Sequence, residues 1–384
     1  MRVKKVVVLG STGSIGVNTL DVIARFPEKF KVVGLTAYNN FPLFEKQLQQ
    51  FSPRYVAVGE EGIRGLKKNF SNLKFFDVMT ELSVIAAMKE VDIVVIGISG
   101  SAALDPFLSA VRAGKTVAPA NKEAIVIAGS LIMQEAQRHQ AKIIPVDSEQ
   151  SAIFQCLAGQ NRRHLKKVYL TASGGPLYRV PQSKFNTLTV EQILRHPRWK
   201  MGKKITVDSA TLMNKGFEVI EAKHLFDLKL EEIEVIIHPE AIIHSMVSFK
   251  DGAILAQLGI TDMRLPIQYA LTYPERCETK LKDLDFFHLK QLTFEKPDTK
   301  KFPSLSLAVY TARQGGTLPS VLNAADEEAV KAFLLEKIPL PAIYKVVEKV
   351  ILQHKINRNP ALEDIYQADR WAREAVKSIL SKIK

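Results

Sequence analysis

The segment VDSATLMNKGFE, residues 207–218, gathers side chains that could contact a phosphate or a metal ion. If the segment is helical, Asn214 and Glu218 lie one turn apart, and Lys215 is also a neighbour of Glu218. Such a face could bind an anion at one end and complete an ion site at the other. A weak surface Lys–Glu pair is the alternative interpretation. The candidate groups are two hydroxyls, an amide, an ammonium and a carboxylate: Ser209, Thr211, Asn214, Lys215 and Glu218.

A second group of carboxylates follows the apolar run KIIPV at residues 142–146. Asp147 and Glu149 are two residues apart, so in an extended segment both would point to one face. With a third, distant carboxylate they would make an all-oxygen site, which suits Mg²⁺ or Mn²⁺ rather than zinc. The alternative is a helix N-cap, because Asp or Ser followed by Glu also opens a helix.

The N-terminal residues predict a fold that binds a dinucleotide. An apolar run at residues 3–9 leads into GSTGSIG at residues 10–16 and then into a helical pattern. Strand, Gly-rich turn and helix are the context that a dinucleotide fingerprint requires, here with G-x-x-G-x-x-G spacing. The next apolar run ends at Tyr38-Asn39-Asn40. Because no acidic residue stands there to bind the ribose of NAD, the sequence favours NADP.

Further apolar runs alternate with helical stretches, a pattern typical of a mostly parallel sheet. Polar groups follow several of these runs. Ligands bind beyond the carboxyl ends of such strands. Asn121, Lys122 and Glu123 follow one run. The strand at residues 166–171 runs into Ser173-Gly174-Gly175, which could cradle an anion or form a plain turn. The loop HPRWKMGKK holds His196 and Trp199 and could be a lid, or could cover a small satellite core.

Composition and charge limit the classes of protein. The chain has 384 residues, which predicts two or three domains, and two cysteines without metal or disulfide spacing, which we expect to be thiols in a reducing cytosol. No apolar run is long enough to span a bilayer. The net charge of +13 suits nucleic acid, an anionic membrane or phosphorylated small molecules. No long basic tract accompanies it, so we expect neither nucleic acid nor membrane as a partner.

The C-terminal part is predicted to be helical. Four amphipathic patterns after about residue 300 indicate a small bundle, and FKDGAIL at residues 249–255 predicts a hairpin whose sheet could mediate homodimerisation. His238 and His244 are interpreted as structural. We expect an α/β protein with an N-terminal Rossmann-like parallel sheet, an α+β central catalytic domain and a C-terminal helical bundle. The expected parts are 1–147, 148–275, a linker at 276–300, and 301–384.

Seven motifs stand in the order found in one enzyme family. The chain resembles 1-deoxy-D-xylulose 5-phosphate reductoisomerases over roughly residues 3–265. The resemblance implies a cytoplasmic, NADPH-dependent enzyme that converts 1-deoxy-D-xylulose 5-phosphate, a sugar phosphate, into 2-C-methyl-D-erythritol 4-phosphate for isoprenoid synthesis. It also implies a divalent metal, Mg²⁺, Mn²⁺ or Co²⁺. The motifs are GSTGSIG, ANKE, PVDSE, LTASGGP, HPRWKMG, VDSATLMNKGFE and HPEAIIHSMV.

The resemblance also assigns roles to residues by motif. Asp147, Glu149 and Glu218 match metal ligands and, with Lys122, form the catalytic set. Substrate contacts are implied for Lys122, Ser148, Glu149, Ser173, His196, Trp199 as the lid tryptophan, Ser209, Asn214, Lys215 and Glu218. Cofactor contacts are implied for Thr12, Gly13, Ser14, Ile15, Asn40, Asn121, Glu123 and Gly202.

Two departures and two other functions accompany the resemblance. Tyr38-Asn39-Asn40 lacks the basic residue that the family usually places beside the 2′-phosphate, and Gln150 stands where many members have His. Another Rossmann oxidoreductase, acting on an acyl or semialdehyde substrate, would need a nucleophilic cysteine or a different base, and neither Cys156 nor Cys277 lies in a suitable motif. A basic nucleic-acid-binding protein would show an affinity for DNA that falls steeply with salt.

Overall fold

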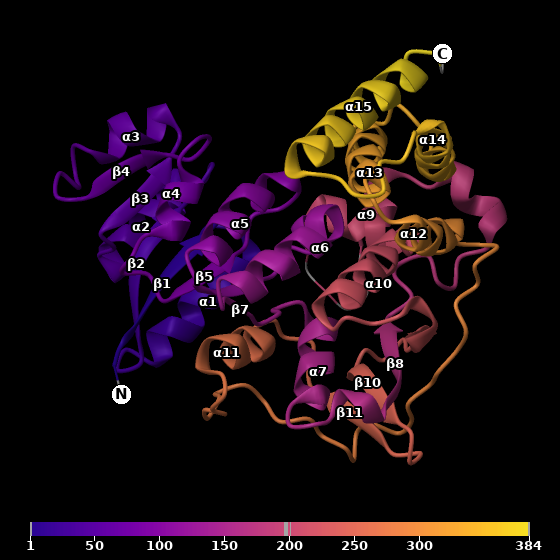
Figure 1. Cartoon of the computed structure of the whole chain (residues 1–384), viewed down its shortest axis with the longest axis horizontal. Coiled ribbons are helices and arrows are strands. Elements are labelled where there is room, and N and C mark those ends of the chain that lie inside the picture. The colour runs from indigo at the N-terminus through magenta and orange to yellow at the C-terminus, as the bar shows by residue number, and fades with distance from the viewer. Residues whose placement is uncertain (1, 196–198, 200, 383–384) are drawn as a thin grey trace. The chain divides into compact units, whose positions relative to one another are not determined.

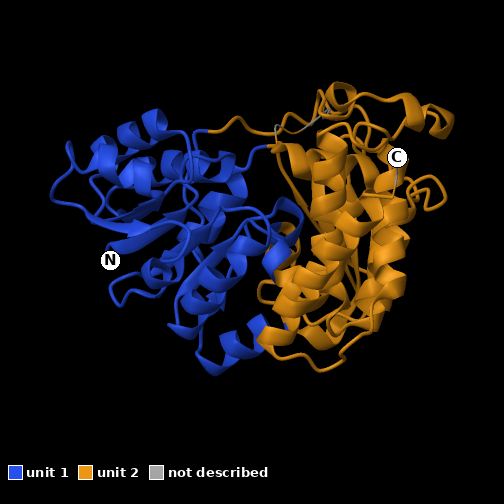
Figure 2. Ribbon diagram, turned by 90° about the horizontal axis from the view of Figure 1, so that it is seen from above, with its two compact units in different colours: residues 1–124, 130–151, 262–280 blue, residues 125–129, 152–261, 281–384 orange. Residues whose placement is uncertain are grey.

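The chain forms two compact units, which are coloured separately in Figure 2. The structure is a computed structural model that describes residues 2–195, 199 and 201–382. Within this described part, every helix is too short or too polar to cross a membrane. The first unit comprises residues 1–124, 130–151 and 262–280, and the second comprises residues 125–129, 152–261 and 281–384.

The first unit contains a seven-stranded parallel sheet with strand order β4-β3-β2-β1-β5-β6-β7 (Figure 1). Its central strands are continuous apolar runs, as expected where both faces of a parallel sheet are covered, and the residues of β5 are almost fully buried. The strands are β1 (Lys4–Leu9), β2 (Phe30–Thr36), β3 (Tyr55–Val58), β4 (Lys74–Asp77), β5 (Ile93–Ile96), β6 (Thr116–Pro119) and β7 (Lys142–Ile143).

A helix lies in every connection between consecutive strands of this sheet, as parallel neighbours require. Gly16 lets the first helix approach the loop before it, because a Cβ at Gly16 would lie 2.4 Å from the carbonyl oxygen of Gly10. The helices are α1 (Ser14–Arg25), α2 (Phe41–Phe51), α3 (Glu60–Leu66), α4 (Leu82–Ala87), α5 (Leu104–Arg112) and α6 (Glu123–Arg138), with η1 (Ser101–Ala103) before α5; α7 (Ser148–Leu157) follows the sheet, and α11 (Arg264–Thr272) packs on α1.

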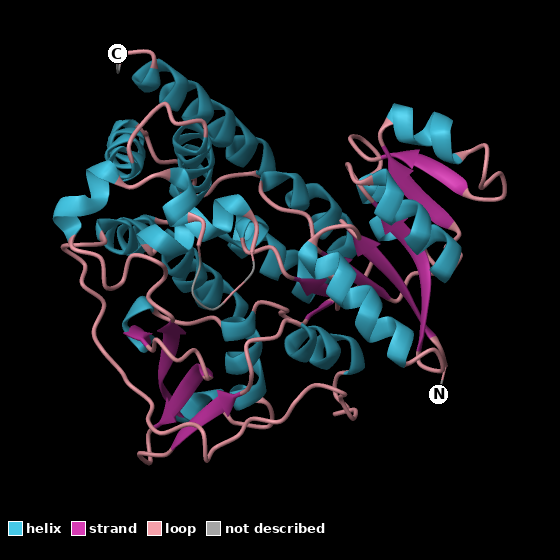
Figure 3. Cartoon of the chain, turned by 180° about the vertical axis from the view of Figure 1, so that it is seen from behind, coloured by secondary structure: helices cyan, strands magenta, loops and turns pink. Residues whose placement is uncertain are grey.

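The second unit contains a four-stranded mixed sheet with strand order β11-β10-β8-β9. Strands are magenta in Figure 3, and this sheet lies at the lower left of that view. Strand β8 is parallel to β9 and antiparallel to β10, and β10 forms a hairpin with β11. The hairpin turn contains Asp251, whose Oδ1 accepts a hydrogen bond from the N–H of Ala253 at 2.9 Å. The strands are β8 (Leu165–Ala172), β9 (Ile233–Ile237), β10 (Ile243–Phe249) and β11 (Ile254–Leu258).

The C-terminal helices, coloured orange to yellow in Figure 1, share one large apolar core with helix α10. Phe217 of α10, Ala308 of α12 and Val321 of α13 are all buried in it. The helices of the second unit are α8 (Val190–Ile193), α9 (Lys203–Thr211), α10 (Met213–Leu225), α12 (Pro303–Gln314), α13 (Leu318–Leu334), α14 (Leu340–Gln353) and α15 (Leu362–Leu380), and the 3-10 turns are η2 (Arg162–His164), η3 (Gln182–Thr187) and η4 (Leu230–Glu232).

The predicted fold class is confirmed, and three local expectations are corrected. Residues 74–77 form a strand, β4, that the sequence did not suggest. The run KIIPV is a strand only at Lys142–Ile143, although the N–H groups of Ile144 and Val146 still donate to the carbonyls of Val117 and Pro119, both at 2.9 Å. The segment 207–218 is two helices, because Leu212 adopts a left-handed conformation with φ 60° between α9 and α10.

Candidate active site

Helices α7 and α10 carry two of the carboxylates that the sequence singled out, Glu149 and Glu218. Ile153 and Cys156 of α7 and Val219 and Ala222 of α10 belong to one apolar cluster with the mixed sheet. Glu149 stands one turn before Ile153 on α7, and residues spaced by three or four share a helix face. Glu149 therefore extends the face of α7 that packs in this cluster, and Glu218 stands directly before Val219 on α10.

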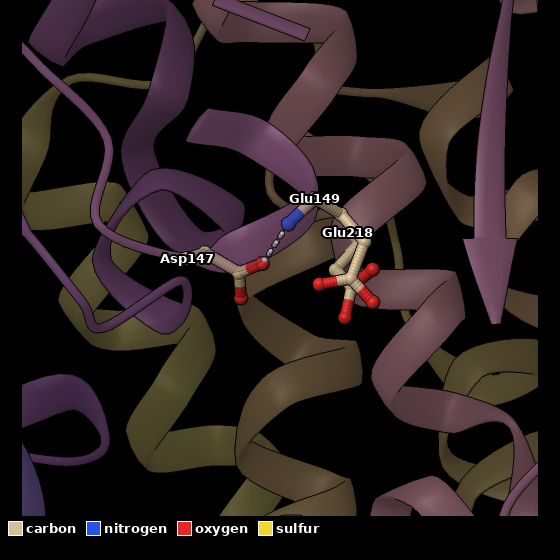
Figure 4. A group of neighbouring side chains, drawn as sticks. All are labelled: Asp147, Glu149 and Glu218. Carbon is tan, nitrogen blue, oxygen red and sulfur yellow. Dashed lines mark hydrogen bonds between the residues drawn. The ribbon is translucent and has the colours of Figure 1, made fainter. Parts of the chain in front are cut away.

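The carboxylates of Asp147, Glu149 and Glu218 come together at the polar end of this packing (Figure 4). One oxygen from each lies within 4.8 Å of the others. Glu218 is 1% exposed and Asp147 is 9% exposed. Buried carboxylates so close repel one another unless positive charge compensates them. An all-oxygen set of this kind has the donor chemistry of a Mg²⁺ or Mn²⁺ site, so the residues present fit a divalent ion.

The segment PVDSE fits both interpretations made from the sequence, because it starts a helix and also supplies candidate metal ligands. Helix α7 begins at Ser148, so the extended backbone assumed for Asp147 and Glu149 is wrong. The Oδ1 atom of Asp147 accepts a hydrogen bond from the N–H of Glu149 at 3.3 Å, and the N–H of Ser151 donates to the Asp147 carbonyl at 2.8 Å. Asp147 therefore caps the helix while it faces the other carboxylates. The hydroxyl of Ser148 donates to Glu149 at 2.5 Å.

Two buried lysines flank the carboxylates. The Nζ atom of Lys122, at the N-cap of α6, lies 2.6 Å from Oδ2 of Asp147. Lys215 forms an ion pair with Glu218 and donates to the carbonyl of Thr171 at 2.5 Å. The amide of Asn214 donates to the other oxygen of Glu218 at 2.5 Å. Lys215 and Asn214 thus fix the carboxylate of Glu218. The contact of Lys215 with the carbonyl of Thr171 could not be predicted from the sequence, because every residue has a backbone carbonyl.

The loop after β8 lies against the end of α9. Gly175 has φ 70°, and a Cβ there would lie 2.4 Å from the carbonyl oxygen of Ser209 and 3.2 Å from its Oγ. Only glycine fits this position without strain. The N–H of Gly175 points to Oγ of Ser173 at 3.4 Å. Ser173 and Ser209, which are far apart in the sequence, are therefore brought together at a glycine turn whose backbone N–H groups could bind an anion.

The loop that was expected to be a lid is only partly described. The ring of Trp199 lies 6.2 Å from the ring of His244, and Gly202 is the N-cap of α9. His238 is fully buried, and its Nε2 accepts hydrogen bonds from the N–H groups of Ile242 and Ile243, both at 3.2 Å. The structure thus gives His238 a structural position. His196 lies outside the described residues.

Apart from Gly202, the expected cofactor residues lie at three helix starts in the first unit. Helix α1 begins at Ser14 after Gly13, which provides no side-chain cap, so its first N–H groups point outward for an anion. Thr12, Gly13, Ser14 and Ile15 form this loop and first turn. Asn40 is exposed and left-handed at the N-cap of α2.

Asn121 and Glu123 stand at the start of α6. The carbonyl oxygen of the Asn121 side chain accepts from the N–H of Ala124 at 3.0 Å, and its amide donates to the Gly100 carbonyl at 3.3 Å. The side chain of Asn121, one residue before the N-cap Lys122, therefore accepts a free N–H of the first turn of α6 and joins the helix to the loop after β5. Glu123 is the first residue of the helix. The starts of α1 and α6 both follow strands of the parallel sheet, at the edge where such folds bind dinucleotides.

A parallel dinucleotide-type sheet, an anion turn and three converging carboxylates define a metal-dependent α/β oxidoreductase. Family comparisons specify it further. The model described as 1-deoxy-D-xylulose 5-phosphate reductoisomerase matches residues 6–129, its C-terminal domain model matches residues 143–226, and a DXP reductoisomerase C-terminal domain model matches residues 258–375.

Curated relatives and solved structures agree with this match. The chain is 50% identical over 374 residues to the reductoisomerase of Pelotomaculum thermopropionicum, covering 96% of this chain and 97% of the relative. It is 48% identical to that of Thermodesulfovibrio yellowstonii, covering 97% and 98%. The structure of the Zymomonas mobilis enzyme in complex with NADPH has a TM-score of 0.93 at 40% identity, covering 99% of this chain and 100% of that chain.

A second solved structure is a DOX-P reductoisomerase in complex with NADPH, fosmidomycin and magnesium. It has a TM-score of 0.92 at 37% identity, covering 99% of this chain and 98% of that chain. The chain belongs to the 1-deoxy-D-xylulose 5-phosphate reductoisomerase family, as its motifs predicted. This membership sets aside the two other functions considered from the sequence.

Proposed function

We propose that the protein converts 1-deoxy-D-xylulose 5-phosphate into 2-C-methyl-D-erythritol 4-phosphate with NADPH and a divalent metal ion, as a step of isoprenoid precursor synthesis. The observation that carries the proposal is the convergence of Asp147, Glu149 and Glu218, with oxygens within 4.8 Å of one another. Family membership and the NADPH and magnesium complexes of related structures support it. Mg²⁺, Mn²⁺ and Co²⁺ are the candidate ions.

The metal ion and NADPH would supply one part of the chemistry, and side chains of the protein would supply the other. Asp147, Glu149 and Glu218 would hold a divalent ion, which would polarise a substrate carbonyl, and bound NADPH would supply hydride. Lys122, whose ammonium lies 2.6 Å from Asp147, is positioned to stabilise a developing oxyanion or to move a proton. Asn214 and Lys215 hold Glu218 in one orientation. They limit the rearrangement needed when an ion binds.

We infer that the substrate phosphate occupies the turn after β8. Ser173 and Ser209 lie there with the backbone of Gly175. Binding energy from this remote group can orient the reacting end of the sugar. The other proposed substrate contacts are Ser148, Glu149, His196, Asn214 and Lys215. We further propose that Trp199, whose ring lies near that of His244, excludes water from the bound substrate.

We infer that NADPH binds along the start of α1 and the loop after β2. The proposed contacts are Thr12, Gly13, Ser14, Ile15, Asn40, Asn121, Glu123 and Gly202. No carboxylate stands at Tyr38-Asn39-Asn40, which removes a repulsion against the 2′-phosphate. We assign the cofactor to residues 1–147, the catalytic and connective role to 148–275, a linker to 276–300 and a helical domain to 301–384.

We further propose a cytoplasmic homodimer. Strand β11 is an edge of the mixed sheet, and its Ile254 is 54% exposed and its Leu255 42% exposed. An exposed apolar edge strand is a surface that another strand can pair with. Two cysteines in 384 residues suit a reducing compartment.

The proposed activity is tested by following NADPH oxidation at 340 nm with 1-deoxy-D-xylulose 5-phosphate. We expect turnover with Mg²⁺, loss of turnover in excess EDTA, and recovery when Mg²⁺ is restored. Glu218→Gln should lower kcat by about 100-fold or more, because the site loses an anionic oxygen. NADPH affinity in that variant should change little.

Glu231→Gln is the matched control, since Glu231 is exposed in η4 of the same unit. It should behave as the wild type. Substrate-dependent NADPH oxidation that persists in EDTA would reject the metal role, and no oxidation under any metal would reject the function.

A further inference from the structure

The loop between β1 and α1 is held on its inner side by residues from two other elements. The N–H of Gly10 donates to Oγ1 of Thr36 at 2.8 Å, and the N–H of Ser11 donates to the carbonyl of Thr36 at 2.8 Å. Ser11 is fully buried. These bonds tie the start of the loop to the end of β2. They leave the Ser11 carbonyl and side chain to be satisfied by another element.

Gln47, in the second turn of α2, satisfies both of these groups. Its amide nitrogen donates to the Ser11 carbonyl at 2.9 Å, and its amide oxygen accepts from the Ser11 hydroxyl at 2.7 Å. The residue is 6% exposed and lies between the core residues Phe44 and Leu48. Packing alone would be served by an apolar residue at this position, because burying an amide has a cost that only hydrogen bonds offset.

The bond to the Ser11 carbonyl has a consequence for the next peptide N–H. In a planar trans peptide, the carbonyl of Ser11 and the N–H of Thr12 point in opposite directions. Gln47 holds the carbonyl toward the core, so the N–H of Thr12 is turned away from the core. The N–H groups of the first turn of α1, which has no side-chain cap, lie next along the chain.

We propose that Gln47 is a positioning residue for the dinucleotide pyrophosphate, which it does not touch. By fixing the Ser11–Thr12 peptide, it presents the Thr12 N–H together with the donors at the start of α1. Helix α2, which carries Gln47, begins directly after the left-handed Asn40, a proposed cofactor contact. Helix α2 thereby joins two stretches of the cofactor site. The inference rests on the proposed NADPH binding.

The decisive comparison uses three single variants and two binding measurements. Gln47→Met keeps the length of the side chain and removes both hydrogen bonds. Ser11→Ala removes the hydroxyl and keeps the bond to the carbonyl. Gln50→Met makes the same chemical change at an exposed position of α2. The Kd for NADPH is measured by fluorescence titration without substrate, and kcat and KM are measured by steady-state assay.

We expect Gln47→Met to raise the Kd and the KM for NADPH about tenfold, with a much smaller effect on kcat. Ser11→Ala should weaken binding less, and Gln50→Met should not weaken it. If Gln47→Met fails to fold, Gln47→Glu carries the test at pH 8, because a carboxylate can accept from the Ser11 hydroxyl but cannot donate to the carbonyl. It too should weaken binding about tenfold or more.

Two results would overturn the inference. One is a folded Gln47→Met or Gln47→Glu protein whose Kd for NADPH stays within about twofold of the wild type. The other is a Ser11→Ala protein that binds as weakly as Gln47→Met, since the carbonyl bond would then not matter. Failure of the proposed function gives a different pattern, in which the wild type itself binds no NADPH.

Discussion

Asp147 shows how one side chain can serve folding and chemistry together. One of its oxygens caps helix α7 through the N–H of Glu149, and the other accepts the ammonium of Lys122 at 2.6 Å. The cap fixes the direction of the carboxylate through the backbone, before any ion binds. A group held this way has little conformational freedom left to lose when it becomes a ligand.

The residue types of the candidate site were predictable, but their geometry was only partly so. Carboxylates at Asp147, Glu149 and Glu218 suggested an oxygen site, and the structure brings them within 4.8 Å. The spacing of Asn214 and Glu218 on one helix was also predicted correctly. The pairing of Lys122 with Asp147 was not foreseen, because it depends on which strand ends become neighbours in the sheet.

His224 gives a prediction about pH and stability. Burial, and secondly the nearby Lys223 ammonium, lower the pKa of His224 to about 4, against 6.5 for an unperturbed histidine. The unfolded chain gains this proton as the pH falls through 6.5, and the folded chain gains it only near 4. The stability from a neutral His224 is therefore complete above pH 6.5 and is lost as the pH falls toward 4, by up to about 3 kcal/mol.

We expect His224→Phe, which keeps a ring without a titrating group, to show a weaker loss of stability over this range. Urea unfolding at pH 7, 5.5 and 4.5 measures the free energy of unfolding for both proteins. The difference between them isolates His224 from carboxylates that titrate in both. Parallel pH curves would show that His224 contributes nothing to the acid sensitivity.

Among the helices and strands, the junction between α9 and α10 shows most clearly what sequence patterns could not predict. Leu212 carries the left-handed turn, although such positions usually favour glycine or asparagine. Its side chain is 3% exposed in the large apolar core of the second unit. Packing there offsets a backbone cost of about 1–2 kcal/mol, a tertiary effect that no local pattern reveals. The hairpin and the C-terminal helices, whose signals are local, were predicted.

Gly216 gives a prediction about how α10 packs on α12. A Cβ at Gly216 would lie 2.4 Å from the Cβ of Ala308, which is fully buried. Gly216→Ala should therefore destabilise the protein by about 1–2 kcal/mol, since overpacking outweighs the gain in helix propensity. The free energy of unfolding in urea is the measurement.

Ala308→Gly supplies the matched test of this contact. Alone it should cost about 1 kcal/mol, as glycine does inside a helix. Combined with Gly216→Ala it should recover most of the lost stability, because the new methyl group takes the space of the removed one. Strictly additive losses in the double variant would show that the two positions do not compete for space.

For the full chain, composition and motif order indicated the fold class and the family, but contacts distant in sequence complete each unit. Helix α11 packs on α1 in the first unit, where Arg264 lies 3.1 Å from Asp21. Lys29 and Glu275 lie 2.9 Å apart nearby. These partners are separated by more than two hundred residues. Hydrophobic periodicity and charge patterns do not predict these contacts, because both describe only residues that are close in sequence.

The proposed homodimer gives the last prediction. Strand β11 pairs with β10 on one side and is the end of the sheet, so among the described residues no strand pairs with its other edge. Ile254 and Leu255 are exposed beside that edge. If this edge is the dimer surface, light scattering coupled to size exclusion should give twice the chain mass, and Ile254→Lys should shift the protein toward monomer by placing charge in an apolar contact.

Leu352→Lys is the matched control for this shift, because Leu352 is 71% exposed on α14 and lies on a different element. It should leave the mass unchanged. A wild-type protein that is monomeric at every concentration would remove the dimer. Equal dissociation by the two lysine variants would place the dimer contact elsewhere, because a general effect of added charge would then explain both. Dissociation by Ile254→Lys alone would identify β11 as part of the contact.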